Sequence, residues 1–242
     1  ALNKADSERM AYLLKEAGFK LVDALEKADL VIVNTCTVKN LAEKKAIKYV
    51  KRLEGMGKKI IVAGCIPKAN PSLFLGHSQI GPNQIHQIVS AVEETLEGNI
   101  VEYLADEHIN KIKIPSLRSN PVIGIIPIAS GCVGNCSYCH VKLARGKLYS
   151  YPIEDIIAAI KHELHTGAKE IWLTSQDSGA YGMDSNTNLA ELLNECSRIP
   201  GKFMIRVGMM NPNHALRILP ELIEAFKSEK IFNFLHLPVQ SG

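Results

Sequence analysis

The fold of the second half of the chain is decided at residues 122–139, which read VIGIIPIASGCVGNCSYC. Residues 122–129 form a nearly continuous apolar run, which predicts a strand covered on both faces. Directly after this run come Cys132, Cys136 and Cys139, at a Cys-x-x-x-Cys-x-x-Cys spacing. In parallel β/α folds the chemistry lies at the carboxyl ends of the strands, so the position of these cysteines predicts a functional site.

The cysteine spacing is typical of an iron–sulfur site. Three thiolates can bind three irons of a 4Fe-4S cluster, and no fourth cysteine follows at close spacing, which leaves one iron open. Gly131 and Gly134 allow the loop to curl tightly around such a cluster. A zinc site completed by His140 is the alternative. Structural zinc sites, however, usually have four closed ligands in Cys-x-x-Cys pairs, and His140 directly follows Cys139.

Beyond the cysteines, helix and strand patterns alternate along the chain. Helices are predicted at residues 153–165, 189–197 and 214–227, and strands at residues 170–174, 203–207 and 232–237. Pro152 precedes the first of these helices and Gly167 follows it, as is common at helix ends. Together with the strand at 122–129, the series predicts the first part of a parallel β/α barrel or half-barrel.

The first hundred residues show the same alternation. Helices are predicted at residues 6–17, 40–53 and 84–96, and short apolar strands at residues 29–34 and 59–63. This order predicts an α/β fold with βαβ units and a doubly wound parallel sheet. Residues 99–121 carry scattered charges and two prolines and are interpreted as a connector. They separate an amino-terminal domain, residues 1–105, from a second domain, residues 118–242.

Composition favours a soluble globular protein, because 46% of the 242 residues are hydrophobic and 22% are charged. No apolar run approaches the roughly 20 residues needed to span a bilayer, and no signal peptide is visible. We therefore expect a cytoplasmic protein that does not enter the membrane. The chain starts at Ala1 rather than at a methionine and stops at Gly242 after a strand-like run. Both ends lead us to expect a piece of a longer protein.

The net charge of +3 is too small to predict nucleic-acid binding by itself. Basic residues nevertheless gather in two segments of the chain. The first contains Lys39, Lys44, Lys45, Lys48, Lys51, Arg52, Lys58 and Lys59, and the second contains Lys142, Arg145 and Lys147. Such segments are either solvated helix faces or a surface that contacts phosphates, and the sequence leaves both interpretations open.

The remaining cysteines lie outside the triple motif. Cys36 and Cys65 each follow a predicted strand of the first half, so they could converge on one site, although two ligands do not make a cluster. Buried structural cysteines are the alternative. Cys196 lies within a predicted helix and is interpreted as a packed core thiol. Because no secretion signal is visible, a disulfide framework is not expected among the six cysteines.

The triple-cysteine motif, with Tyr138 before its last cysteine, resembles that of the radical S-adenosylmethionine (SAM) superfamily. The resemblance implies that Cys132, Cys136 and Cys139 hold a catalytic 4Fe-4S cluster, whose open iron is chelated by the amino and carboxylate groups of SAM. The reduced cluster would then cleave the sulfonium to give a 5′-deoxyadenosyl radical. Tyr138 matches the aromatic position that lies beside the adenine in this superfamily.

Three further segments resemble the amino-terminal domain of the methylthiotransferases: residues 2–8 (LNKADSE), 34–38 (NTCTV) and 63–67 (AGCIP). That family binds an auxiliary 4Fe-4S cluster there through three cysteines, so the resemblance implies that Cys36 and Cys65 are two of its ligands. The family's first cysteine lies just before the segment that matches the start of this chain. The third ligand is therefore absent here, and we expect that the sequence was cut after it.

The resemblance continues at the strand ends of the second domain, in the segments 144–146, 149–152, 174–182, 206–212 and 236–242. It implies that the methionine amino group of SAM and nearby atoms are bound by Ser175, Gln176 and Asp177. It further implies that Arg206 pairs with a carboxylate, since its fork suits that geometry. The substrate side is implied to be lined by Arg145, His236 and Gln240.

These strand-end segments look most like the archaeal and eukaryotic branch of the family, although Ser178 stands where Thr is expected. That branch converts N6-threonylcarbamoyladenosine next to the tRNA anticodon into its 2-methylthio derivative. The implied cofactors are two 4Fe-4S clusters and SAM. One SAM would provide a methyl group to sulfur near the auxiliary cluster, and another the radical that abstracts hydrogen from C2 of the adenine.

The implied partners are the anticodon stem-loop of tRNA, whose loop bases can be splayed into a pocket, and an electron donor. The family's carboxy-terminal RNA-binding barrel and the last strands of its catalytic barrel lie beyond this sequence. Two alternatives remain. One is a radical SAM methylthiotransferase that acts on a ribosomal protein side chain, and the other is a non-catalytic zinc-binding module.

Overall fold

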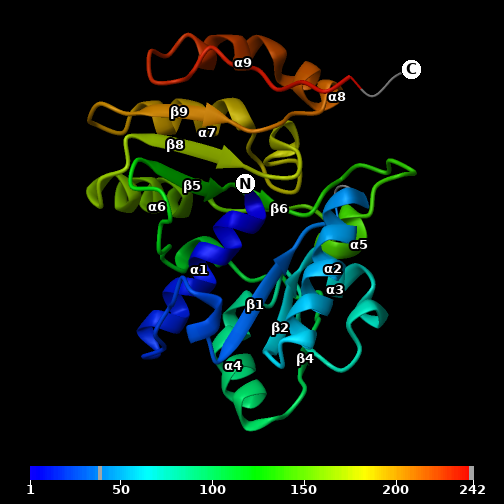
Figure 1. The fold of residues 1–242 in the computed structure, drawn as a ribbon. Coiled ribbons are helices and arrows are strands. Elements are labelled where there is room, and N and C mark those ends of the chain that lie inside the picture. The colour runs from blue at the N-terminus through cyan, green and yellow to red at the C-terminus, as the bar shows by residue number, and fades with distance from the viewer. Residues whose placement is uncertain (38–39, 240–242) are drawn as a thin grey trace. The chain divides into compact units, whose positions relative to one another are not determined.

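The computed structural model describes residues 1–37 and 40–239, and the chain divides into two compact units (Figure 1). The amino-terminal unit consists of residues 6–117 together with residues 134–146. The carboxy-terminal unit consists of residues 1–5, 118–133 and 147–242. Each unit is built on its own parallel sheet.

The amino-terminal unit contains a parallel four-stranded sheet with the order β1-β2-β3-β4. Its strands are β1 (Leu30–Thr35), β2 (Lys59–Gly64), β3 (Ser78–Ile80) and β4 (Glu102–Tyr103). Its helices are α1 (Leu2–Glu16), α2 (Asn40–Gly55), α3 (Cys65–Ala69), α4 (Ile88–Glu97) and α5 (Val141–Arg145), with 3-10 turns η1 (Leu25–Lys27), η2 (Pro71–Phe74), η3 (Ile85–Gln87) and η4 (Lys111–Lys113). The register pairs Thr35 with Gly64, so β1 and β2 end side by side.

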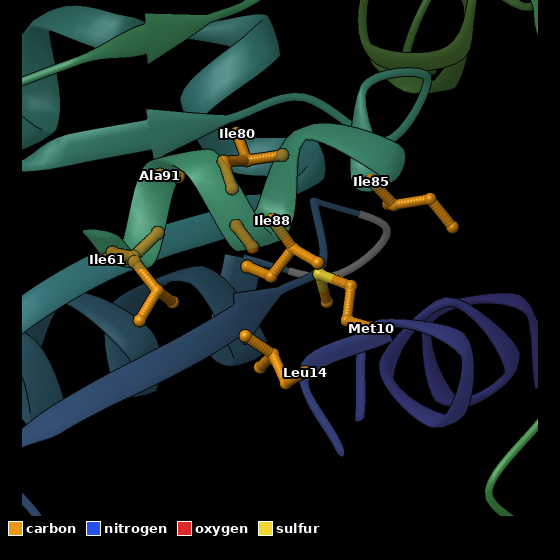
Figure 2. Packing of buried hydrophobic residues seen from close by; sticks show 9 residues of the cluster. Met10, Leu14, Ile61, Ile80, Ile85, Ile88 and Ala91 are labelled. Atoms are coloured by element: carbon orange, nitrogen blue, oxygen red, sulfur yellow. The ribbon is translucent and has the colours of Figure 1, made fainter. Parts of the chain in front are cut away.

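Side chains alternate along β2 and contribute to two hydrophobic cores, one on each face of the sheet. On one face, Ile61 and Ala63 belong to a core with Met10 and Leu14 of α1 and with Ile88 of α4 (Figure 2). Burying a side chain such as Ile61 or Ile88 contributes about 1.5–3 kcal/mol to folding. This core therefore fixes α1 and α4 against the sheet.

On the opposite face of the sheet, Ile60 and Val62 pack with Val50 and Leu53 of α2 and with Ile66 of α3. The predicted α/β architecture, a parallel sheet covered by helices on both faces, is thereby confirmed. It differs from a doubly wound sheet in one respect, because the strand order follows the chain without the reversal that such sheets contain.

The predicted elements of this unit are found with small shifts at their ends. Helix α4 ends at Gly98, whose φ of +98° is a conformation that glycine adopts at low cost after a helix. The first residues of the helix predicted at 84–96 instead form the 3-10 turn η3. Helix α3 and strands β3 and β4 were not predicted, because segments of five residues or fewer are too short to show a helical or alternating period.

The carboxy-terminal unit contains a parallel three-stranded sheet with the order β5-β8-β9. Its strands are β5 (Ile123–Pro127), β8 (Glu170–Thr174) and β9 (Met204–Val207), and its main helices are α6 (Ile153–His165) and α7 (Leu189–Ser197). A short antiparallel pair, β6 (Ala129–Ser130) and β7 (Tyr149–Ser150), follows β5, and the 3-10 turn η5 (Ser178–Ala180) follows β8. Strand β8 and helices α6 and α7 have the predicted bounds.

The prediction of a single helix at residues 214–227 was wrong. The structure has three shorter elements there, α8 (Pro212–Ala215), η6 (Leu216–Ile218) and α9 (Leu219–Phe226). Pro220 lacks an N–H group, so it cannot donate to the carbonyl oxygen of Leu216 and the helix is interrupted. The last segment, α9, begins with this proline in its first turn, where a missing donor costs least.

The prediction of a fourth strand at residues 232–237 was also wrong, since the described residues form no strand there. Only an isolated parallel bridge joins Ile205 to Ile231. Further along, the N–H of Met210 donates to the carbonyl of His236 at 3.0 Å. The segment therefore follows β9 without forming a ladder. No helix among the described residues has the length and apolarity that crossing a membrane requires.

Candidate iron–sulfur and cofactor sites

The triple-cysteine motif lies in the loop between β6 and α5. None of the three is in a disulfide, and Cys132 is half-buried whereas Cys136 and Cys139 are exposed. The N–H of Cys139 donates to the carbonyl of Cys136 at 3.0 Å, which closes a turn between these two cysteines. Exposed thiols that are not engaged in disulfides are chemically suited to bind iron as thiolates.

Tyr138 lies exposed in this turn and hydrogen-bonds Cys136. Desolvation of its hydroxyl, followed by its interactions with Cys136 and Cys139, raises the pKa of Tyr138. Within residues 1–37 and 40–239, no three His, Cys, Asp or Glu side chains are grouped as a metal site. The role of the three cysteines as cluster ligands and that of Tyr138 beside an adenine therefore stay predictions from the sequence.

Gln176 and Ser175 follow the carboxyl end of β8, where the sequence predicted SAM-binding groups. The Gln176 Oε1 atom is buried and has no hydrogen-bond partner among the described residues. A buried acceptor without a partner costs about 1–3 kcal/mol, so it suits a ligand that brings a donor, such as an ammonium group. The Ser175 hydroxyl lies 3.2 Å from that of Ser178.

Asp177, the third predicted cofactor residue, is already engaged by protein donors. Its Oδ1 atom accepts hydrogen bonds from the N–H groups of Gly179 and Asn211, both at 3.0 Å. Its Oδ2 atom lies 2.5 Å from His214 Nδ1. Asp177 therefore joins the loop after β8 to the loop after β9, and its role toward a cofactor stays a prediction. His214 was not predicted, because a lone histidine outside any motif gives no signal in the sequence.

The Arg206 guanidinium lies between two aromatic rings of the carboxy-terminal unit. Its central carbon is 4.8 Å from the centre of the Trp172 ring and 4.7 Å from that of Phe234. Cation–π contacts at these distances attract the guanidinium to the ring faces and help to hold it in place. The fork of N–H donors of an arginine suits a carboxylate. Pairing of Arg206 with a carboxylate stays a prediction.

The residues predicted on the substrate side lie in three different settings. Arg145 is buried at the end of α5, with 1% of its surface exposed, so its side chain is not on an open face of its unit. His236 is exposed and follows the isolated bridge beside β9. Gln240 lies outside the described residues. Contact of either residue with a substrate stays a prediction. For Arg145, the burial of the side chain does not favour such contact.

Cys36 and Cys65 follow β1 and β2, which are neighbouring parallel strands of the amino-terminal unit. Gly64, directly before Cys65, has a φ of +94°. A Cβ atom there would lie 2.4 Å from both Asn34 Oδ1 and the carbonyl oxygen of Thr35, so only glycine fits. Cys65 is buried and Cys36 is half-buried, and neither is in a disulfide. The register ends the two strands side by side, and convergence of the two cysteines on one site stays a prediction.

A cluster of buried charges in the amino-terminal unit was not predicted. Asp6 forms ion pairs with Lys111, at 3.1 Å, and with Arg145, at 2.7 Å. Arg9 belongs to the same cluster, since its Nε atom donates to the Lys111 carbonyl at 3.0 Å. Burial would raise the pKa of Asp6, but Lys111 and Arg145 outweigh this effect and lower it. No local pattern connects residues so far apart in the chain.

The sequence was compared with known protein families, and two parts of it match a family. Residues 126–242, which include all three motif cysteines, match the family described as the radical SAM superfamily. The chain thus carries a radical SAM domain over residues 126–242. Residues 1–80 of this radical SAM chain, which include Cys36 and Cys65, match an uncharacterized protein family, UPF0004.

Curated relatives match this radical SAM chain from end to end. It is 45% identical over 247 residues to a probable threonylcarbamoyladenosine tRNA methylthiotransferase of Pyrococcus horikoshii, covering 100% of this chain and 58% of the relative. It is 41% identical over 250 residues to the human threonylcarbamoyladenosine tRNA methylthiotransferase, covering 99% of this chain and 43% of the relative. The chain thus spans about half the length of these relatives.

Among solved structures, a similar fold is found in the radical S-adenosylmethionine methyltransferase TsrM from Kitasatospora setae, solved with cobalamin and a [4Fe-4S] cluster bound. The TM-score is 0.62 at 12% identity, over 94% of this chain and 54% of that chain. At this identity the likeness concerns the fold alone, and it confirms the mixed α/β architecture of the radical SAM chain.

Proposed function

We propose that the protein containing this chain is a methylthiotransferase that converts N6-threonylcarbamoyladenosine in tRNA into its 2-methylthio derivative by radical SAM chemistry. The observation that carries the proposal is identity of 45% and 41%, along the whole chain, with archaeal and human relatives of that name. The three cysteines of the radical SAM motif and the two strand-end cysteines supply the donor groups that this chemistry needs.

The catalytic cluster would be held by Cys132, Cys136 and Cys139. The donor set fits a 4Fe-4S cluster with one open iron, because three cysteines outside any disulfide are present and no fourth cysteine follows nearby. When bound, the cluster supplies the electron that cleaves SAM. The chain's own residues would bind and orient the cofactor, and the orphaned acceptor at Gln176 supports such a ligand.

In this proposal Gln176 Oε1 accepts a hydrogen bond from the methionine ammonium of SAM. The stacked guanidinium of Arg206 donates its in-plane N–H groups to the carboxylate of SAM, in the fork geometry that such pairs prefer. Tyr138, exposed in the cysteine turn, provides the aromatic face for the adenine. Asp177 keeps the two strand-end loops joined through its bonds to Asn211 and His214.

An auxiliary 4Fe-4S cluster would be held by Cys36 and Cys65 together with a cysteine supplied by the longer protein. Two features of the amino-terminal unit support it. The first is the register that ends β1 and β2 side by side, and the second is Gly64, where a side chain would collide with Asn34. We further propose that residues 1–105 form the auxiliary-cluster domain and residues 118–242 the radical SAM domain.

The exposed face of α2 would contact part of the tRNA. Five basic residues of this helix are exposed, namely Lys44, Lys45, Lys48, Lys51 and Arg52. Cations spaced along one helix suit the phosphates of an RNA stem, which contribute most of the affinity of such interfaces without reading sequence. Because its substrate is tRNA, we propose a cytoplasmic enzyme, which receives electrons from a separate donor protein.

The test is mass spectrometry of nucleosides from tRNA of cells that lack their own methylthiotransferase and express the full-length protein. We expect the 2-methylthio derivative with the wild type and its absence with Cys136→Ala. Cys196→Ala is the matched control, because Cys196 is a buried thiol of α7 and should leave the mark in place. Failure of the wild type to restore the mark would contradict the proposal. Methylthiolation found on a protein would instead favour the ribosomal alternative.

A further inference from the structure

Arg145 lies inside a cluster of buried charges that joins three separate segments of the amino-terminal unit. Its Nη2 atom is 2.7 Å from Asp6 Oδ2, and Lys111 Nζ is 3.1 Å from Asp6 Oδ1. The side chains of Asp6 and Lys111 are each 3% exposed, and that of Arg145 is 2% exposed. Charges as deeply buried as these persist only when they are paired, so the geometry of Arg145 is strongly determined.

The same guanidinium also reaches the strand end that carries Cys65. Arg145 hydrogen-bonds the Cys65 side chain, and helix α5, which ends at Arg145, packs against α3, which begins at Cys65. Burial by itself would lower the pKa of Arg145, but Asp6 and then Cys65 outweigh that effect and keep the guanidinium charged. A permanent cation therefore contacts one of the two thiols of the proposed auxiliary site.

The local structure after α5 holds Arg145 in this position. The next residue, Gly146, has a φ of +74° and turns the chain out of the helix at once. A Cβ atom there would lie 3.2 Å from His108 Nε2, a tight contact that adds to the strain of the positive φ. Asp6 also pairs with two cations, Lys111 and Arg145, through a single carboxylate, so it does not belong to Arg145 alone.

We propose that Arg145 is a positioning residue of the auxiliary site, which donates a charged hydrogen bond to the sulfur of Cys65 while Asp6 holds its guanidinium. The inference rests on the proposed function, since it requires a cluster at Cys36 and Cys65. Arg145 follows the last cysteine of the radical SAM motif by six residues. The segment that carries the catalytic cysteines thus also supplies a cation to the other cluster.

The physical consequence is a higher reduction potential of the auxiliary cluster. Hydrogen bonds and positive charge at a ligand sulfur stabilise the reduced, more negative state of an iron–sulfur cluster. A buried guanidinium exerts this effect strongly, because little water screens it. A purely structural role for Arg145 would lower the stability of the unit but leave the potential unchanged.

The experiment uses the full-length protein with Cys132→Ala, Cys136→Ala and Cys139→Ala, so that only the auxiliary cluster remains after anaerobic reconstitution. Its midpoint potential is measured by redox titration followed by electron paramagnetic resonance, with and without Arg145→Gln. We expect Arg145→Gln to lower the potential by about 59 mV, a tenfold change for one electron. Lys142→Gln is the matched control, because Lys142 lies exposed on the same helix, and should leave the potential unchanged.

Arg145→Lys keeps the charge but loses the fork that can bond Asp6 and Cys65 together. We expect a smaller shift in the same direction, and this variant decides the matter if Arg145→Gln does not fold by circular dichroism. An unchanged potential at full iron content in both folded variants would overturn the inference alone. A background protein that binds no iron would contradict the auxiliary cluster itself, and the inference with it.

Discussion

The Nη2 atom of Arg145 lies 2.7 Å from Oδ2 of Asp6, although 139 positions separate the two residues in the chain. The contact ties the first helix to the segment that follows the triple-cysteine motif. Together with Lys111, it makes a buried three-charge network in the unit that carries Cys36 and Cys65.

Removing the shared carboxylate should strongly destabilise the amino-terminal unit. Asp6→Ala leaves Lys111 and Arg145 buried without their counter-ion, and breaking such a buried pair costs about 3–5 kcal/mol. The free energy of unfolding in urea measures the effect. Asp106→Ala is the control, because the Asp106–Lys68 pair is largely exposed on the Asp106 side and should cost about 0–1 kcal/mol. Equal losses in the two variants would refute the account of the network.

Stability should depend on pH through Lys111. Burial lowers the pKa of Lys111 to about 8, against the opposing charge of Asp6 and with the help of Arg145 and Arg9. Besides these groups, its ammonium contacts the carbonyl of Pro82.

Between pH 8 and the ordinary lysine value, the unfolded chain thus binds a proton that the folded chain has lost. The free energy of unfolding should therefore rise with pH in that window, by up to about 1.4 kcal/mol per pH unit, relative to Lys111→Met. A difference between wild type and variant that stays flat or falls over this window would show the sign to be wrong.

The cysteines should differ sharply in their reactivity in the cluster-free protein. Cys136 and Cys139 are exposed, whereas burial, followed by the charge of Glu195, raises the pKa of Cys196 to about 12. Because the thiolate is the nucleophile, iodoacetamide at neutral pH should alkylate Cys136 and Cys139 well before Cys196. Peptide mass spectrometry over time measures the three rates. Labelling of Cys196 as fast as the other two would contradict its burial in α7.

Gly64→Ala should damage the strand end that carries Cys65. The new Cβ would lie 2.4 Å from Asn34 Oδ1 and from the Thr35 carbonyl, at a φ of +94°. We expect a loss of about 3 kcal/mol in the free energy of unfolding, from strain and overpacking together. Gly57→Ala is the control, since Gly57 also has a positive φ but open space around it, and should cost about 1 kcal/mol. Similar losses in both variants would mean that Gly64 is not sterically required.

Much of the fold could be predicted from short-range patterns. The helix at 153–165, the strand at 170–174 and the helix at 189–197 have the predicted bounds, because each has clear end signals and one period throughout. The helix predicted at 214–227 failed at Pro220, where the missing N–H group outweighed the apolar period. The strand predicted at 232–237 failed because propensity alone does not make a ladder, and the chain beside β9 forms only one bridge, between Ile205 and Ile231.

In the candidate sites too, local patterns could be predicted from the sequence, whereas contacts between distant residues could not. The cysteines could be predicted as ligands because ligand spacing is local, and the strand-end positions of Cys36 and Cys65 follow from the order of elements. The pairing of Asp6 with Lys111 and Arg145 could not be predicted, since more than a hundred residues separate the partners. For the same reason Arg145 was assigned to the substrate side, whereas its side chain is buried in contact with Cys65.

Iron and acid-labile sulfide content shows whether the chain contributes to two distinct four-iron clusters. The full-length protein is reconstituted anaerobically beside the variant Cys132→Ala/Cys136→Ala/Cys139→Ala. The account predicts about eight irons per chain, falling to about four in the variant. About four irons falling to none would remove the auxiliary cluster and methylthiolation with it, and no iron in either protein would contradict the radical SAM mechanism itself.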